Sequence, residues 1–284
     1  MTDETGFALS RRAFAATGLV AGFALAGGPV RADAIITDAN GLDAGEVSIP
    51  VSDGVIPGYR AKPKGVANAP AILVVQEVFG VHEHIRDICR RFAKQGYYAV
   101  APSLYARQGD PGKYDLGSVG KLVTDIVSKV PDAQVMGDLD ATAKFAGGDG
   151  ADLSRLGITG FCWGGRIVWL YCAHSSAVRA GVAWYGPLKG ESNALRPSHP
   201  IDIAAQLKAP VLGQYGGMDK GITASDIEKM RAALKAAGKT DCRIDVFPDA
   251  GHGFFADYRP SYNAKDAQEG WAHCLSWMRE HGVG

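Results

Sequence analysis

Short apolar runs alternate with segments of helix length along most of this 284-residue chain. We expect a hairpin over 46–51 and 55–61, followed by strands over 71–76, 98–101, 156–160, 181–185, 211–215 and 243–247. Helical patterns occupy 84–95, parts of 121–145, 164–174, 223–237 and 263–281. Strands that are separated by helices run parallel, and a parallel sheet is covered on both faces. The alternation therefore predicts an α/β fold with a mostly parallel central sheet and helices on both sides.

Composition limits the number of domains and the kind of partner. Apolar residues make up 46% of the chain, which is enough to bury the core of one domain, and we place that domain at 35–284. Thirty basic residues balance thirty acidic ones, so the formal net charge is zero. A chain without excess positive charge is not expected to bind nucleic acid or an anionic membrane. A small uncharged or modestly charged ligand is the expected partner.

The first 34 residues read as a signal for export. Arg11 and Arg12 precede a Gly- and Ala-rich apolar run over 15–28, and Ala32-Asp33-Ala34 has the small residues of a cleavage site. The run is shorter than the roughly 20 residues that cross a bilayer, which disfavours a retained anchor or other stable membrane partner. We predict a cleaved twin-arginine signal peptide, the twin-arginine export machinery as a partner, and a mature protein that is periplasmic or secreted. A retained anchor or a disordered tail is the alternative.

Five cysteines are present, and none belongs to a C-x-x-C pair of the kind that binds zinc or exchanges disulfides. We therefore predict no metal, and no motif for a nucleotide or flavin cofactor is found. In an oxidising compartment Cys89, Cys172, Cys242 and Cys274 could pair in combinations that the sequence does not determine, or they could be small buried apolar residues. Cys162 is the candidate for a free thiol.

Cys162 stands where a catalytic nucleophile is expected. The sequence Gly160-Phe161-Cys162-Trp163-Gly164 has the form of a G-x-S-x-G nucleophile elbow, with cysteine in place of serine, between a predicted strand and a predicted helix. Glycines flank the nucleophile because the turn is too sharp for side chains there. The start of a helix also favours a thiolate and supplies N–H donors for an oxyanion. The alternative is a glycine-rich turn with an inert buried cysteine.

An acid and a histidine follow Cys162 in the order nucleophile, acid, base. Asp219 comes just after the predicted strand at 211–215, and His252 lies between two glycines after the strand at 243–247. A carboxylate at this place can fix the tautomer of the imidazole, which then accepts the thiol proton. A solvated loop aspartate is the alternative for Asp219. Four other histidines are weaker candidates, expected either at the pocket rim or in structural roles, at positions 82, 84, 273 and 281.

Several separated motifs together resemble the dienelactone hydrolases, also called carboxymethylenebutenolidases. The resemblance runs from about Val47 to the C-terminus and rests on segments 75–80, 102–107, 160–165, 184–186, 217–219 and 251–254. It implies an α/β-hydrolase fold and a Cys-His-Asp triad at Cys162, His252 and Asp219 that cleaves a cyclic enol ester through a covalent acyl-enzyme.

The resemblance also gives a role to Glu77, a carboxylate at the end of an apolar strand, where burial is costly unless the charge is paired. By similarity, Glu77 contacts the resting thiol and helps to activate it when substrate arrives. The alternative is a carboxylate that only stabilises the N-terminus of the next helix. The resemblance further implies that the backbone N–H groups of Val78 and Trp163 form the oxyanion hole, and that Phe79 and Tyr185 contact the substrate.

The substrate is less defined than the reaction. Dienelactone enzymes hold a substrate carboxylate with arginines, one of them just after the catalytic histidine, and here Arg259 is the nearest equivalent but is displaced. Arg107 or Lys121 are candidates for the second anion-binding residue. We expect a carboxylic ester hydrolase that acts on an ester or lactone. The alternatives are a thioesterase, a non-catalytic periplasmic binding protein with the same fold, and a redox-active thiol protein.

Overall fold

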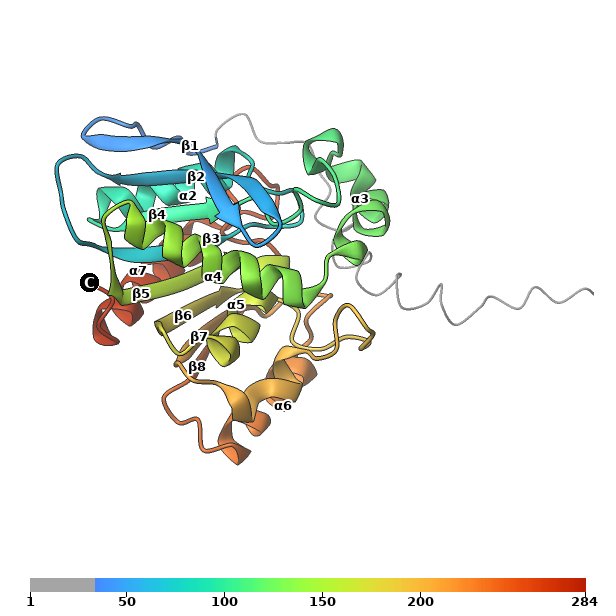
Figure 1. The fold of residues 1–284 in the computed structure, drawn as a ribbon. Helices are drawn as coiled ribbons and strands as arrows, with labels where there is room; N and C mark the ends of the chain where they lie inside the picture. The colour runs from blue at the N-terminus through green and yellow to red at the C-terminus, as the bar shows by residue number, and fades with distance from the viewer. Residues whose placement is uncertain (1–33) are drawn as a thin grey trace, which may run out of the picture.

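The computed structural model describes residues 34–284, which form an eight-stranded sheet in the order β1-β2-β4-β3-β5-β6-β7-β8 (Figure 1). The predicted signal peptide and its Arg11-Arg12 pair lie outside these residues, apart from Ala34. Its prediction is therefore untested by the structure. Among the described residues, no helix is both long enough and apolar enough to span a bilayer.

One edge of the sheet is antiparallel and the remainder is parallel. The first two strands, β1 (Leu42–Val51) and β2 (Gly54–Pro63), form the predicted hairpin, and β2 pairs antiparallel with β4 (Tyr98–Pro102). All later pairs are parallel, and they involve β3 (Ala69–Val75), β5 (Ala151–Phe161), β6 (Val178–Trp184), β7 (Val211–Gly216) and β8 (Arg243–Phe247). Because β4 also pairs in parallel with β3, parallel pairing brings the carboxyl ends of six strands to one edge.

Helices cover both faces of this sheet, as predicted (Figure 1). One face carries α2 (Glu83–Lys94) and α7 (Ala264–Glu280), and the other carries α4 (Asp132–Gly148), α5 (Trp163–His174) and α6 (Ala224–Ala236). Because the central strands have helices on both sides, their side chains are almost completely buried, and in β3 the run from Ala71 to Val75 has no exposed surface. The chain has the α/β fold that its alternating pattern predicts.

The observed ends of strands and helices differ from the predicted ones mainly where the hydrophobic pattern of the sequence is weak. The predicted strand at 156–160 extends back to Ala151 in β5, through polar residues that periodicity does not mark as strand. The helical stretch at 121–145 is divided into α3 (Val119–Asp125), a 3₁₀ turn over Val127–Lys129 and α4. Pro131 stands directly before α4 and separates it from the preceding turn, because proline disfavours helical geometry in the residue before it.

Two short segments of the chain complete the fold around the sheet. Directly after the predicted cleavage site, the Thr37 N–H donates to buried Asp87 at 2.5 Å, and Arg90 donates to the Thr37 carbonyl at 2.8 Å, which ties this segment to α2. The connection from β6 to β7 passes through a 3₁₀ helix, η4 (Pro200–Gln206).

All five cysteines are free thiols in this structure.

Candidate active site

Four predicted residues come together at the carboxyl edge of the sheet because each follows a different strand. Glu77 follows β3, Cys162 follows β5, Asp219 follows β7 and His252 follows β8. In a parallel sheet these strand ends point the same way, so loops far apart in sequence become neighbours. This edge is where the sequence predicts the chemistry.

The elbow around Cys162 has the strained backbone that its sequence predicts. Cys162 has φ +55° and ψ −116° and stands immediately before the first residue of α5. A side chain at Gly164 would place its Cβ 2.5 Å from the carbonyl oxygen of Gln76, and one at Gly160 would lie 2.5 Å from the carbonyl oxygen of Gly164. Only glycine permits these close approaches. A non-glycine residue at positive φ is held there by its surroundings, as is typical of functional sites.

His252 links the other two members of the predicted triad. Its Nδ1 lies 2.7 Å from Asp219 Oδ2, while Asp219 Oδ1 accepts the N–H groups of Gly221 at 2.8 Å and Ile222 at 3.2 Å. Burial lowers the pKa of His252, but its interactions with Cys162 and Asp219 outweigh this effect and raise the pKa to about 10. The imidazole is therefore held in a fixed orientation in which its protonated form is favoured at neutral pH.

Glu77 is fully buried and belongs to a second cluster of polar side chains. Its Oε2 accepts the Tyr258 hydroxyl at 2.5 Å and lies 3.3 Å from His82 Nε2, and its Oε1 lies 3.6 Å from Arg259 Nη2. Burial raises the pKa of Glu77, but the charge of Arg259 and the contact with His82 outweigh it and hold the pKa well below its ordinary value. Among the described residues, Glu77 has no polar contact with the Cys162 thiol, so its predicted role in thiol activation stays a prediction.

Tyr185 lies beside the predicted triad. It follows β6, has φ +37°, and stands beside Cys162 in the sheet because Trp184 and Phe161 pair in register. Its ring lies edge-on to the His252 ring, with 5.2 Å between centroids. Its buried hydroxyl has no hydrogen-bond partner among residues 34–284. A strained tyrosine beside the predicted triad is typical of a functional site, and its contact with the substrate stays a prediction.

The predicted oxyanion donors and Phe79 lie at the same edge. Trp163 is the first residue of α5, so its N–H has no partner within the helix. Val78 follows Glu77 and is fully buried. The Phe79 ring lies 5.3 Å from the Arg259 guanidinium, which places both predicted substrate contacts beside Glu77.

The two other candidate cations have carboxylate partners outside these clusters. Arg107 binds Asp53 in the β1–β2 turn and Asp138 in α4, and its side chain is 23% exposed. Lys121 pairs with Asp125 one helical turn away. Neither contact brings an anion-binding group to Cys162, and their predicted substrate role stays untested.

The four other histidines considered as candidates separate into one cluster member and three structural residues. His82 contacts Glu77. His84 is buried and paired with Asp257 at 3.2 Å. His273 pairs with Asp245. His281, which directly follows α7, contacts the carbonyl of Trp277 within that helix. Tyr258, which sequence reasoning missed, lies next to Arg259 in a turn-rich segment where the pattern gives no signal of its contact with Glu77.

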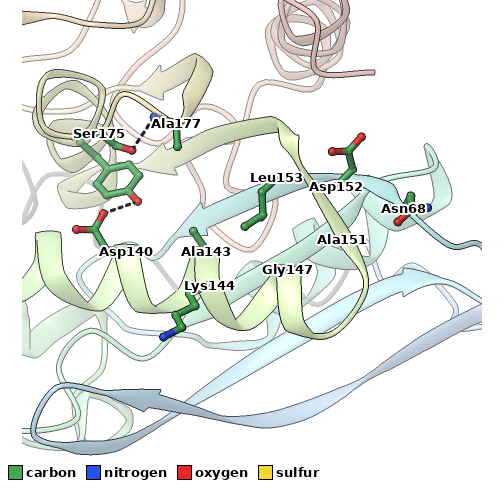
Figure 2. A pocket seen from close by; sticks show the side chains of 11 residues that line it. Asn68, Asp140, Ala143, Lys144, Gly147, Ala151, Asp152, Leu153, Ser175 and Ala177 are labelled. Carbon is green, nitrogen blue, oxygen red and sulfur yellow. Dashed lines mark hydrogen bonds between the residues drawn. The ribbon is translucent and has the colours of Figure 1, made fainter.

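A surface groove lies away from these residues, at the amino ends of β5 and β6 (Figure 2). It has a volume of about 640 Å³ and is lined by α4 and the start of β5, including Lys144 and Leu153. Asp140 on its wall is already bound to the Tyr171 hydroxyl at 2.9 Å and to His174 at 2.8 Å. Within residues 34–284 no group of three or more His, Cys, Asp or Glu side chains could hold a metal ion.

The sheet order, the elbow and the positions of Cys162, Asp219 and His252 define the class of protein as the α/β-hydrolases. Residues 56–282 match the dienelactone hydrolase family. The chain belongs to this family and is a hydrolase of the lactone or ester type, similar to the carboxymethylenebutenolidases, which confirms the resemblance seen in the sequence.

Relatives and a solved structure agree with this membership. A Methylorubrum extorquens protein named "Putative carboxymethylenebutenolidase" is 62% identical over 97% of this chain and 94% of its own length. An Escherichia coli K12 protein of the same name is 50% identical over 94% of this chain and 98% of its own length. The crystal structure of a "Putative Dienelactone Hydrolase" from Klebsiella pneumoniae has a TM-score of 0.81 and 52% identity, covering 84% of this chain and 99% of that one.

Proposed function

We propose that this protein is a carboxylic ester hydrolase that opens an ester or lactone through a covalent thioester on Cys162. The observation that carries the proposal is the 2.7 Å contact between His252 and Asp219 at the elbow of Cys162. Membership of the family does not by itself identify the reacting groups, which this proposal names.

The acylation step uses the side chains in the order that their contacts suggest. Cys162 Sγ attacks the substrate carbonyl carbon, and His252 accepts the thiol proton while Asp219 holds its Nδ1. The C–O bond then breaks, and the imidazolium donates its proton to the leaving alkoxide or enolate. Water attacks the thioester with His252 as base, which releases the acid and restores the thiol.

Negative charge on the carbonyl oxygen requires donors that are already in place. We assign this role to the N–H groups of Val78 and Trp163, on the loop after β3 and at the start of α5. The close packing of Gly164 against the carbonyl oxygens of Val75 and Gln76 supports the assignment, because it brings these two segments together.

Steady-state hydrolysis of a dienelactone, a neutral aryl ester and a thioester by protein that begins at Ile35 tests the reaction. We expect turnover of at least one of these, and a loss of about 10³-fold or more in kcat/KM for Cys162→Ala. Mass spectrometry of quenched wild-type enzyme should show the acyl adduct on Cys162. If neither the wild type nor Cys162→Ala hydrolysed any of the three substrates, the proposal would be overturned. Ligand binding would then be the function to test.

We also propose that the chain leaves the cytoplasm by the twin-arginine route and acts in the periplasm or outside the cell. The Arg11-Arg12 pair before an apolar run supports this proposal. Fractionation of cells that express the full chain should find mature protein outside the cytoplasm, and Arg11→Lys with Arg12→Lys should retain it inside. Cytoplasmic retention of the unaltered chain in a host with an active twin-arginine system would contradict export.

A further inference from the structure

Residues 37–40 form a short segment, here called the N-terminal strap, that lies on helix α2. The Thr37 N–H donates to Asp87 Oδ1 at 2.5 Å, and Arg90 Nε donates to the Thr37 carbonyl at 2.8 Å. Lys94, the last residue of the helix, donates to a side-chain oxygen and a carbonyl oxygen of the strap at 2.9 and 2.8 Å. Three side chains of one helix therefore bind the strap.

The carboxylate of Asp87 has no exposed surface and depends on hydrogen-bond donors around it. Besides the Thr37 N–H, its Oδ1 accepts Arg90 Nη2 at 3.0 Å and its Oδ2 accepts Arg91 Nε at 2.6 Å. Burial of a carboxylate costs free energy unless its oxygens are hydrogen-bonded and its charge is paired. The backbone N–H of the strap is thus part of what stabilises Asp87.

Arg91 connects Asp87 to a second buried carboxylate, that of Asp257. Its Nη2 pairs with Asp257 Oδ2, and Asp257 Oδ1 lies 3.2 Å from His84 Nδ1. Burial raises the pKa of Asp257, but its contacts with His84 and Arg91 outweigh this effect and lower the pKa. One guanidinium therefore bridges the carboxylate that binds the strap and a carboxylate in the turn over 257–259.

The two residues after Asp257 hold Glu77. Tyr258 donates to Glu77 Oε2 at 2.5 Å and accepts from Arg259 Nε at 2.9 Å, while Arg259 Nη2 lies 3.6 Å from Glu77 Oε1. The strap and Glu77 are thus at the two ends of one series of buried polar contacts, which runs through Asp87, Arg91 and the 257–259 turn.

The place of this turn in the chain gives the series a bearing on the reaction. His252 lies in the same connection between β8 and α7, five residues before Asp257. Catalytic groups must stay within about 0.5 Å of their productive positions. A turn released from α2 would shift the partners of Glu77 directly, and it would loosen the segment that carries the predicted base.

We propose that the N-terminal strap positions the active site: through Asp87 and Arg91 it holds the 257–259 turn, and with it Glu77, in the arrangement that the reaction needs. The inference rests on the proposed function and adds that the residues just after the predicted cleavage site are part of the working enzyme. Thr37, Asp87 and Arg91 contact each other and the turn, so they are positioning residues.

Removal of the strap tests the inference by kinetics. Protein that begins at Gly41 should have a kcat/KM about 10–100-fold below that of protein that begins at Ile35, with the loss in kcat, because small displacements of catalytic groups are costly. Arg155→Met is the matched control. It removes hydrogen bonds to the carbonyls of Asn68 and Gly284, at the amino end of β3, and should change kcat/KM by less than about twofold.

Two substitutions at Thr37 test the same contact in a chain of full length, in case the shortened protein does not fold. Thr37→Pro removes the N–H that binds Asp87 and keeps the carbonyl, so kcat/KM should fall at least about fivefold. Thr37→Ala keeps both backbone groups and removes only the hydroxyl, which lies 3.4 Å from Asp87 Oδ2. Thr37→Ala should stay within about twofold of wild type.

Amide hydrogen exchange tests the connection without turnover. In both strap variants the amides of Ala256 and Arg259, which form hydrogen bonds within the connection from β8 to α7, should exchange at least about tenfold faster. The amides of Gly221 and Ile222, which bind Asp219, should keep their rates. A change in global stability alone would speed both pairs together.

The two readouts separate this inference from the proposed reaction. Unchanged exchange at Ala256 and Arg259, or faster exchange there with unchanged kcat/KM, would overturn the inference while leaving Cys162-dependent hydrolysis intact. The same holds if both pairs of amides are affected equally. If wild type hydrolysed none of the substrates but exchange responded as expected, the proposed reaction would fail and the hold of the strap on the turn would stand.

Discussion

Two buried ionic groups at the same edge of the sheet are constructed differently. Asp219 uses both oxygens in short hydrogen bonds, one of them to His252 at 2.7 Å. Glu77 and Arg259 face each other at 3.6 Å through Oε1 and Nη2, and neither atom makes a hydrogen bond within the described part of the chain. The first contact fixes the geometry that proton transfer needs, whereas the second balances two charges that are joined only through Tyr258, whose hydroxyl accepts from Arg259 Nε at 2.9 Å and donates to Glu77 Oε2 at 2.5 Å. The two should therefore respond differently to the same kind of substitution.

The largest effect is expected where geometry is fixed. Asp219→Asn keeps the shape of the side chain but favours the wrong imidazole tautomer, so kcat/KM should fall by about 10³–10⁴-fold, whereas the melting temperature at neutral pH should fall by only about 2–4 °C. Kinetics and thermal unfolding of the same preparation measure both quantities. A loss of less than about tenfold would show that Asp219 does not orient the base.

Substitution of Glu77 or Arg259 should show its effect first in the free energy of unfolding. Either Glu77→Gln or Arg259→Met leaves one buried charge unpaired, so each should lower the free energy of unfolding by about 3–5 kcal/mol. The double variant removes both charges and should be less destabilised than the sum of the two singles. Denaturant unfolding of the three variants measures this coupling, and additive losses would mean that the charges do not interact.

The two groups should also respond to pH in opposite directions. Because the pKa of His252 is raised from 6.5 to about 10, its contribution to stability is complete below pH 6.5 and is lost as pH rises towards 10. The pKa of Glu77 is lowered, so its contribution is present above its ordinary value of 4.5 and is lost as pH falls below that value. Asp219→Asn should flatten the alkaline fall in melting temperature by about 2–4 °C, and Glu77→Gln should flatten only the acid fall. Unchanged profiles would contradict these assignments.

The smallest effect is expected at Arg107, which is outside both groups. Arg107→Met should change kcat/KM for a neutral aryl ester or a dienelactone by less than about twofold and lower the melting temperature by about 2–4 °C, since Asp138 is left buried without its partner. A tenfold loss confined to the dienelactone would instead show that Arg107 binds the substrate carboxylate.

How much was predictable from the sequence depends on whether the signal is local. The elbow at Cys162 and the motifs at Asp219 and His252 are short patterns that follow strands, so their meeting at one edge follows from parallel topology. The contact of Tyr258 with Glu77 joins residues 181 positions apart, and no periodicity encodes it. The early start of β5 was missed since its first residues are polar.

The placement of the reacting groups has a consequence for how such a protein can change. Glu77, Cys162, Asp219 and His252 follow β3, β5, β7 and β8, whereas the loops after β4 and β6 carry Tyr105, which packs on the Trp163 ring, and Tyr185, but no member of the predicted triad. These two loops can therefore vary without altering the four predicted reacting groups. Exchange of the β4 and β6 loops between relatives would change the residues beside the site while leaving those groups in place, which makes this pair of loops a natural target for combinatorial libraries.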